Sequence, residues 1–230
     1  MRQKILGTTK PALTESRFTQ AEERKIVEPM EKAITIYKQL NDEKQVASAN
    51  FQLGAYYARV WTRQRDDTAA RSKLNQAFMN LERARQYFFL RPGEETTAVA
   101  VSIEMSNLFT GMGGDNKATL KKGLECILNV VDAFSPSSAD FVREDGKTID
   151  AFNKWKKDME ELAKKVKGKV EELALKLARA EKNEGDKNGS AWRQFCKTVL
   201  KFGVSEEEAV AAVPFPIYDM LKKLKEDVPS

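Results

Sequence analysis

The stretch Asn50-Phe51-Gln52-Leu53-Gly54-Ala55-Tyr56-Tyr57 lies within the most regular helical pattern of the chain. Apolar and aromatic residues recur there every three or four positions, a spacing that places them on one face of an α-helix. A second pattern follows after an acidic turn and carries a small–large–small set, Ala77, Leu81 and Ala84. Two helices with apolar stripes and a short connection are expected to pack antiparallel. We therefore predict a helical hairpin over Gln45–Pro92 and interpret the rest of the chain around it.

The composition favours an all-α fold. Of the 230 residues, 41% are hydrophobic and 32% are charged, which suits a packed helical core with a charged surface. A half-buried strand requires alternating apolar and polar residues, and no segment shows convincing alternation. No apolar run approaches the roughly 18 residues of a membrane span. Residues 1–13 lack the apolar segment of a signal peptide, and two cysteines make no disulfide framework, so we expect a cytoplasmic or nuclear protein.

The expected architecture is an array of antiparallel helical hairpins, then a long charged helix and short C-terminal helices. Proline, glycine and serine clusters set the boundaries. The predicted parts are a mobile N-terminal segment (1–14), a helical array (15–134), a linker (135–146) and a long helix with a C-terminal helical cap (147–230).

Within the array, we expect one helix to start at Pro29, because proline is well tolerated at the first position of a helix. We place its Ala33, Tyr37 and Leu40 on one apolar face. Further helices are expected at 43–65, 69–90, 96–112, 117–134 and 147–182. The helix at 147–182 has a narrow apolar stripe, which predicts packing against a single neighbour.

The absence of histidine argues against an enzyme. The chain has 39 Lys and Arg, 34 Asp and Glu, and no His. Imidazole acid–base catalysis, Ser-His and Cys-His nucleophiles and His-ligated zinc are therefore excluded. The glycine-rich segment Gly111–Thr119 lacks the Gly-Lys-Ser/Thr sequence and the preceding strand of a phosphate-binding loop, so we interpret it as an interhelix turn. We predict a non-enzymatic protein with no cofactor and no metal site.

The central hairpin resembles the tetratricopeptide repeat, a helix–turn–helix unit of roughly 34 residues. The matching residues are Leu53-Gly54 with Tyr57, the set Ala77, Leu81 and Ala84, and Pro92. The pattern departs from the family at Asn50, which stands where the family has Trp, and in the greater length of both helices. The resemblance covers about residues 29–134 and implies a stacked array with an extended surface for a protein partner.

A narrower resemblance is to the C-terminal helical region of erythroid differentiation-related factor proteins. It rests on the 51–57 stretch, on Gln86-Tyr87-Phe88 and on Ser106-Asn107-Leu108. It implies a relation to a nuclear regulatory protein, and the chain would then be a fragment or a short relative of one.

The predicted function is a protein–protein interaction or scaffold module, with a partner that carries an acidic segment. Arg59 and Arg63 are the candidates to bind that segment. The predicted partner-binding residues are Phe51, Ala55, Arg59, Trp61, Arg63, Arg65, Ile103 and Asn107.

A cluster of cations in the hairpin leaves a second function open. Eight arginines and lysines fall between residues 59 and 91, with Trp61 among them. Such a surface would suit nucleic acid, through phosphate contacts and base stacking. The alternative prediction is therefore a nucleic-acid-associated or transcription-regulatory module. Charges distributed around a solvated helix surface would produce the same composition.

Overall fold

The computed structural model describes residues 20–63, 70–89, 91, 93–113, 116–134, 147–183, 191–201 and 216–229. Every element in these ranges is helical, and none of these residues lies in a strand, so the all-α prediction is confirmed. The elements are α1 (Gln20–Gln39), α2 (Glu43–Arg63), α3 (Ala70–Phe88), α4 (Glu95–Gly113), α5 (Lys117–Asn129), the 3₁₀ helix η1 (Val130–Phe134), α6 (Lys147–Asn183), α7 (Ala191–Lys201) and α9 (Pro216–Glu226).

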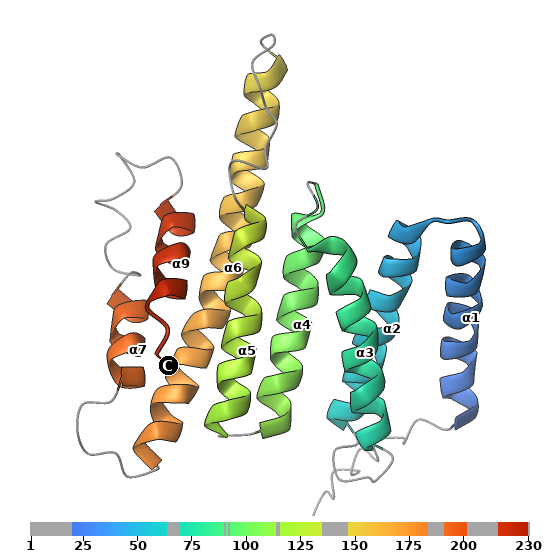
Figure 1. Cartoon of the computed structure of the whole chain (residues 1–230), viewed down its shortest axis with the longest axis horizontal. Coiled ribbons are helices and arrows are strands. Elements are labelled where there is room, and N and C mark those ends of the chain that lie inside the picture. The colour runs from blue at the N-terminus through green and yellow to red at the C-terminus, as the bar shows by residue number, and fades with distance from the viewer. Residues whose placement is uncertain are drawn as a thin grey trace, which may run out of the picture.

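Helices that follow each other in the chain pack side by side from α1 to α7. Figure 1 shows them as a row, with α1 at one end and α7 and α9 at the other. A single hydrophobic core runs along the row from Val27 in α1 to Leu224 in α9. The small–large–small set of α3 is completely buried in it, as the sequence pattern predicts: Ala77, Leu81 and Ala84.

The first helix corrects one expectation, because α1 does not start at Pro29 but runs through it. An interior proline removes one backbone hydrogen bond and crowds the preceding turn, at a cost of about 3 kcal/mol. Here the residue is exposed, and apolar side chains on both sides of it, Val27 and Met30, belong to or pack against the core. Packing against α2 therefore holds the helix continuous. Leu40 is also not on the buried face, since it follows the helix and is 68% exposed.

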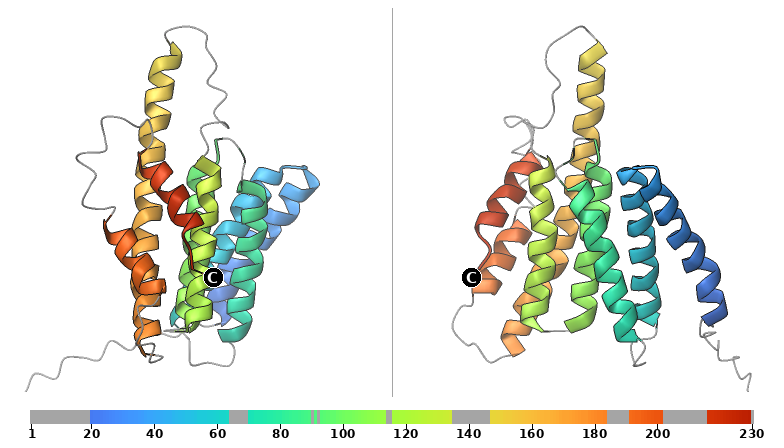
Figure 2. Two further views of the ribbon diagram at one scale, coloured as in Figure 1. Left: turned by 60° about the vertical axis from the view of Figure 1, so that its left-hand side comes forward. Right: turned by 45° about the vertical axis from the view of Figure 1, so that its right-hand side comes forward.

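The long helix α6 corrects a second expectation. It contacts α4 and α5 as well as α7 and α9, rather than one neighbour. The apolar stripe is wider than its large residues alone indicate, because Ala163, Ala174 and Ala180 are buried as well. Its first turns extend beyond the neighbouring helices (Figures 1 and 2).

Several predicted features lie outside the described residues. These are the N-terminal segment 1–14, the hairpin turn with Arg65, the closing Pro92 and the linker 135–146. Within the described residues, no helix combines the length and the apolar character needed to cross a membrane.

Candidate binding groove

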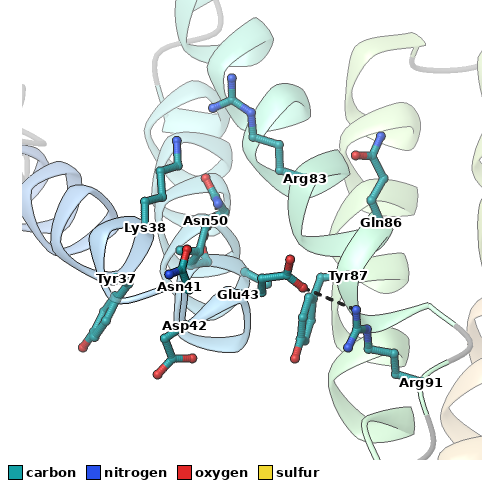
Figure 3. A pocket seen from close by; sticks show the side chains of 12 residues that line it. Tyr37, Lys38, Asn41, Asp42, Glu43, Asn50, Arg83, Gln86, Tyr87 and Arg91 are labelled. Atoms are coloured by element: carbon teal, nitrogen blue, oxygen red, sulfur yellow. Dashed lines mark hydrogen bonds and ion pairs between the residues drawn. The ribbon is translucent and has the colours of Figure 1, made fainter.

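A pocket of about 480 Å³ opens where the end of α1, the start of α2 and the end of α3 meet (Figure 3). Two local features of the connection between α1 and α2 shape this pocket. Asn41 adopts a left-handed backbone conformation (φ 54°) directly after α1. Asp42 then caps α2, since its Oδ1 accepts a hydrogen bond from the backbone N–H of Gln45 at 3.1 Å. The pocket is lined by Tyr37, Lys38, Asn41, Asp42, Glu43, Val46, Ala47, Asn50, Arg83, Gln86, Tyr87 and Arg91.

A second pocket of about 250 Å³ continues along the same three helices. Asn50 and Arg83 line both pockets, so the two form one groove. Its α2 residues recur every three or four positions, and the groove therefore follows the axis of α2, with α1 and α3 as its walls. Figure 2 shows α1 leaning away from α2 towards its N-terminal end. The second pocket is lined by Glu31, Ile34, Asn50, Leu53, Tyr57, Gln76, Met79, Asn80 and Arg83.

Two buried asparagines, one on α2 and one on α3, give the groove polar walls. Asn50 is 4% exposed and Asn80 is 7% exposed. In each, Nδ2 donates a 2.8 Å hydrogen bond to the backbone carbonyl four residues earlier, of Val46 and Gln76 respectively. This bond occupies a donor and leaves the amide oxygen as an acceptor for another group.

Gln76 adds a further acceptor to the same groove. Its Oε1 is buried and accepts no hydrogen bond from any residue that the structure describes. A buried polar atom without a partner costs about 1–3 kcal/mol. Because this oxygen is enclosed, the acceptors suited to the N–H groups of a bound chain are the amide oxygens of Asn50 and Asn80.

Interactions within the protein hold the end of the groove near Arg91. Its guanidinium lies 4.0 Å from the ring centroid of Tyr87. The same group forms a 3.6 Å ion pair with Glu43 of α2. These contacts join the end of α3 to the start of α2 across the pocket (Figure 3).

Two cations on opposite walls remain without a counterion. Lys38 of α1 and Arg83 of α3 are exposed, and neither forms an ion pair with any residue that the structure describes. Figure 3 shows the two side chains extending in the same direction from their opposite walls, with Asn50 between them.

Burial and nearby carboxylates change the acidity of Tyr57 at the far end of the groove. Burial is the main cause, with Glu31 and Glu23 adding to it, and together they raise the pKa of Tyr57 to about 12. Its ring also lies 5.3 Å from Nζ of Lys73. Tyr57 is therefore a neutral phenol at physiological pH.

The predicted binding residues on α2 lie in different environments. Phe51 is partly buried against the core, whereas Ala55 and Trp61 are buried, so their side chains contact other parts of the protein. Arg59 is exposed, and its Nε donates a hydrogen bond to the carbonyl oxygen of Ala55 at 3.3 Å. Arg63 is exposed at the last position of α2.

The remaining predicted residues lie on α4, apart from Arg65. Ile103 is partly buried against the core, and Asn107 is exposed. None of the seven predicted residues that the structure describes lines either groove pocket. Partner binding by the predicted α2–α4 face stays a prediction.

Ion pairs within the protein engage part of the cation cluster of the hairpin. Lys73 pairs with Glu23, Arg85 with Glu82, and Arg91 with Glu43. The ion pair with Arg85 lowers the pKa of the Glu82 carboxyl. Among the described residues, the cluster leaves Arg59, Arg63, Arg71 and Arg83 without an ion pair. Arg59 and Arg63 lie towards the end of α2, and Arg71 and Arg83 lie on α3.

Sequence reasoning missed the groove, although one signal was present. Asn50 interrupts the apolar stripe of α2, and Asn80 lies beside the buried Leu81 of α3. A polar residue within a buried helical face requires a hydrogen-bond partner or a binding role. The wall formed by α1 was harder to predict, because its position depends on the angle at which α1 packs against α2.

Among the described residues, no group of three or more His, Cys, Asp or Glu side chains is placed to hold a metal ion. Cys126 lies close to α4, and burial raises the pKa of its thiol to about 11. Comparison with protein-family models, curated protein sequences and solved structures finds no match to this chain. The function of the protein is therefore inferred from the groove.

Proposed function

We propose that this protein is a non-enzymatic docking module that holds a segment of a partner protein in the groove between α1, α2 and α3. One observation carries the proposal. The groove runs along three helices, and its two asparagines, Asn50 and Asn80, each keep an amide oxygen that accepts no hydrogen bond from any residue that the structure describes. Such acceptors suit the N–H groups of an extended chain better than a helix, which satisfies its own backbone.

The size of the groove fits a short extended segment. Its α2 residues run from Glu43 to Tyr57, which corresponds to about 21 Å at 1.5 Å per residue. An extended chain covers that distance with about six residues. Apolar side chains beside the amides, Ile34 and Met79, supply surface for burial of the segment's own side chains.

We also propose that α2–α5 are hairpins of tetratricopeptide-like type. The support is the burial of the residues that carry the resemblance, including Leu53, Tyr57 and the small–large–small set of α3. The helices α4 and α5 also pack closely at a glycine, because a Cβ added at Gly123 would lie 3.3 Å from the carbonyl oxygen of Ser106. We further propose that the docked partner places the protein in a regulatory complex of the cytoplasm or nucleus.

A site-specific photo-cross-linker tests the docking module. Met79 is 55% exposed and lines the groove, whereas Met112 on α4 is 45% exposed and lines neither pocket. We would place a benzophenone amino acid at either position, irradiate the protein in extract of the cells that express it, and identify adducts by mass spectrometry. A discrete protein adduct from position 79 alone is expected. Adducts from both positions alike, or from neither, would contradict the proposal.

A further inference from the structure

The charges along the groove are unevenly balanced. At one end, Arg91 is paired with Glu43, and Asp42 is engaged in capping α2. At the other end, Glu31 lies near Tyr57 and contributes to raising the pKa of that phenol. Between these ends stand Lys38 and Arg83, two cations on facing walls that have no counterion among the described residues. The groove therefore has a local positive centre with acidic groups on both sides.

We propose that the segment bound in the groove carries a carboxylate side chain, Asp or Glu, that binds between Lys38 and Arg83. This inference rests on the proposed docking function and names the chemistry of the partner. The planar guanidinium of Arg83 can bind both oxygens of a carboxylate, while the lysine ammonium approaches from the opposite wall as a point charge.

The neighbouring asparagine fixes where the backbone of the segment runs. Because one N–H of Asn50 Nδ2 is engaged with the carbonyl of Val46, the side chain offers a ligand its oxygen and its second N–H, the pair that matches a peptide backbone. That oxygen would repel a carboxylate and accept a hydrogen bond from a peptide N–H. The segment therefore lies with its backbone on Asn50 and its acidic side chain directed to the two cations.

The same charges argue against a polyanion in this groove. Nucleic acid would bring phosphates along the whole length, beside the carboxylates of Glu31, Asp42 and Glu43. Like charges at short range oppose binding. A single carboxylate fits the single positive centre, so an acidic peptide is the ligand that the charge distribution favours.

Selection from a displayed library of short random peptides tests the inference without knowledge of the natural partner. The full-length chain serves as bait, and the enriched peptides are synthesised for binding measurements by fluorescence anisotropy. Peptides placed in the groove by the position-79 photo-cross-linker are then tested on the double variant Lys38→Glu/Arg83→Glu. The matched control is Lys32→Glu/Arg71→Glu, which makes the same charge change at exposed positions of the same helices outside both pockets. Circular dichroism checks that both variants fold.

We expect groove-binding peptides with Asp or Glu enriched at one position. The Lys38/Arg83 reversal should weaken them roughly tenfold or more, and added salt should weaken them too. The control reversal should change the Kd by less than about threefold.

Two other results would overturn the inference, and they differ in what else they overturn. Peptides that cross-link at position 79 without acidic enrichment, and that tolerate the Lys38/Arg83 reversal, would refute the carboxylate subsite but leave the docking function standing. Absence of any enriched peptide that cross-links at position 79 would refute the docking function, and the subsite with it.

Discussion

Gly54 of α2 lies directly against Leu81 of α3. A Cβ added at the glycine would be 2.8 Å from Cγ of Leu81 and 3.0 Å from its backbone nitrogen. Since one of these atoms belongs to the backbone, the clash could not be relieved by a side-chain rotation alone. The absence of a side chain at this position is what lets α2 and α3 pack so closely, and their pairing forms the floor and one wall of the groove.

Gly54→Ala should therefore destabilise the protein. Overpacking of a tight contact costs about 1–3 kcal/mol, and the better helix propensity of alanine offsets about 1 kcal/mol of it. We expect a net loss of up to about 2 kcal/mol in the free energy of unfolding, measured by urea denaturation. Gly168→Ala is the matched control, because nothing lies within 4 Å of its added Cβ in the middle of α6. That change should stabilise by about 0.5–1 kcal/mol, and a loss of stability there would contradict the packing argument.

Trp61 provides a test of the sequence-based binding site. The residue is 7% exposed and belongs to the hydrophobic core. Trp61→Ala should lower the free energy of unfolding by about 3–5 kcal/mol, as expected for a large buried aromatic residue. Trp61→Phe should keep most of that stability and leave partner capture unchanged. A Phe variant of normal stability that loses its partner would restore the binding role.

These residues show what the sequence does and does not determine. Burial of Leu53, Ala77 and Leu81 follows from helical periodicity, which depends only on neighbouring positions of one element, and it was predicted correctly. The groove depends on the relative tilt of α1, and no local pattern encodes that. Pro29 even favoured the wrong start for this helix, because a local preference was overridden by packing on both sides of the proline.

Tyr57 gives the protein a specific sensitivity to alkali. Its pKa in the folded state is raised from 10.0 to about 12, so the unfolded chain loses this proton first as the pH rises. The stabilisation from the neutral phenol is complete below pH 10.0 and is lost as the pH passes from 10.0 to about 12. Tyr57→Phe removes this dependence. Urea unfolding of both proteins should give similar stabilities near neutral pH, with the wild type falling below the variant at about pH 11; parallel profiles would refute the assignment.

The nucleic-acid alternative predicts a steep dependence of affinity on salt. Because Lys73, Arg85 and Arg91 are engaged with carboxylates, we expect no retention of RNA or DNA by the protein in filter binding at low salt. Retention that falls steeply as salt is added would reinstate the alternative. Loss of that retention in the variant Arg59→Glu/Arg63→Glu would then place the nucleic-acid site at the exposed end of α2.

Asn50 should separate stability from binding more cleanly than any other groove residue. Its amide is buried, yet the one side-chain hydrogen bond that it forms among the described residues, to the carbonyl of Val46, is local to α2. Alanine has the higher helix propensity, by roughly half a kcal/mol, and this gain offsets part of the lost bond. Asn50→Ala is therefore expected to change the free energy of unfolding by less than about 1 kcal/mol. The selected peptides should bind it several-fold more weakly by fluorescence anisotropy, because the acceptor for their backbone is gone. Unchanged affinity would mean that the bound chain does not run over Asn50, whereas a large loss of stability would assign the residue to folding.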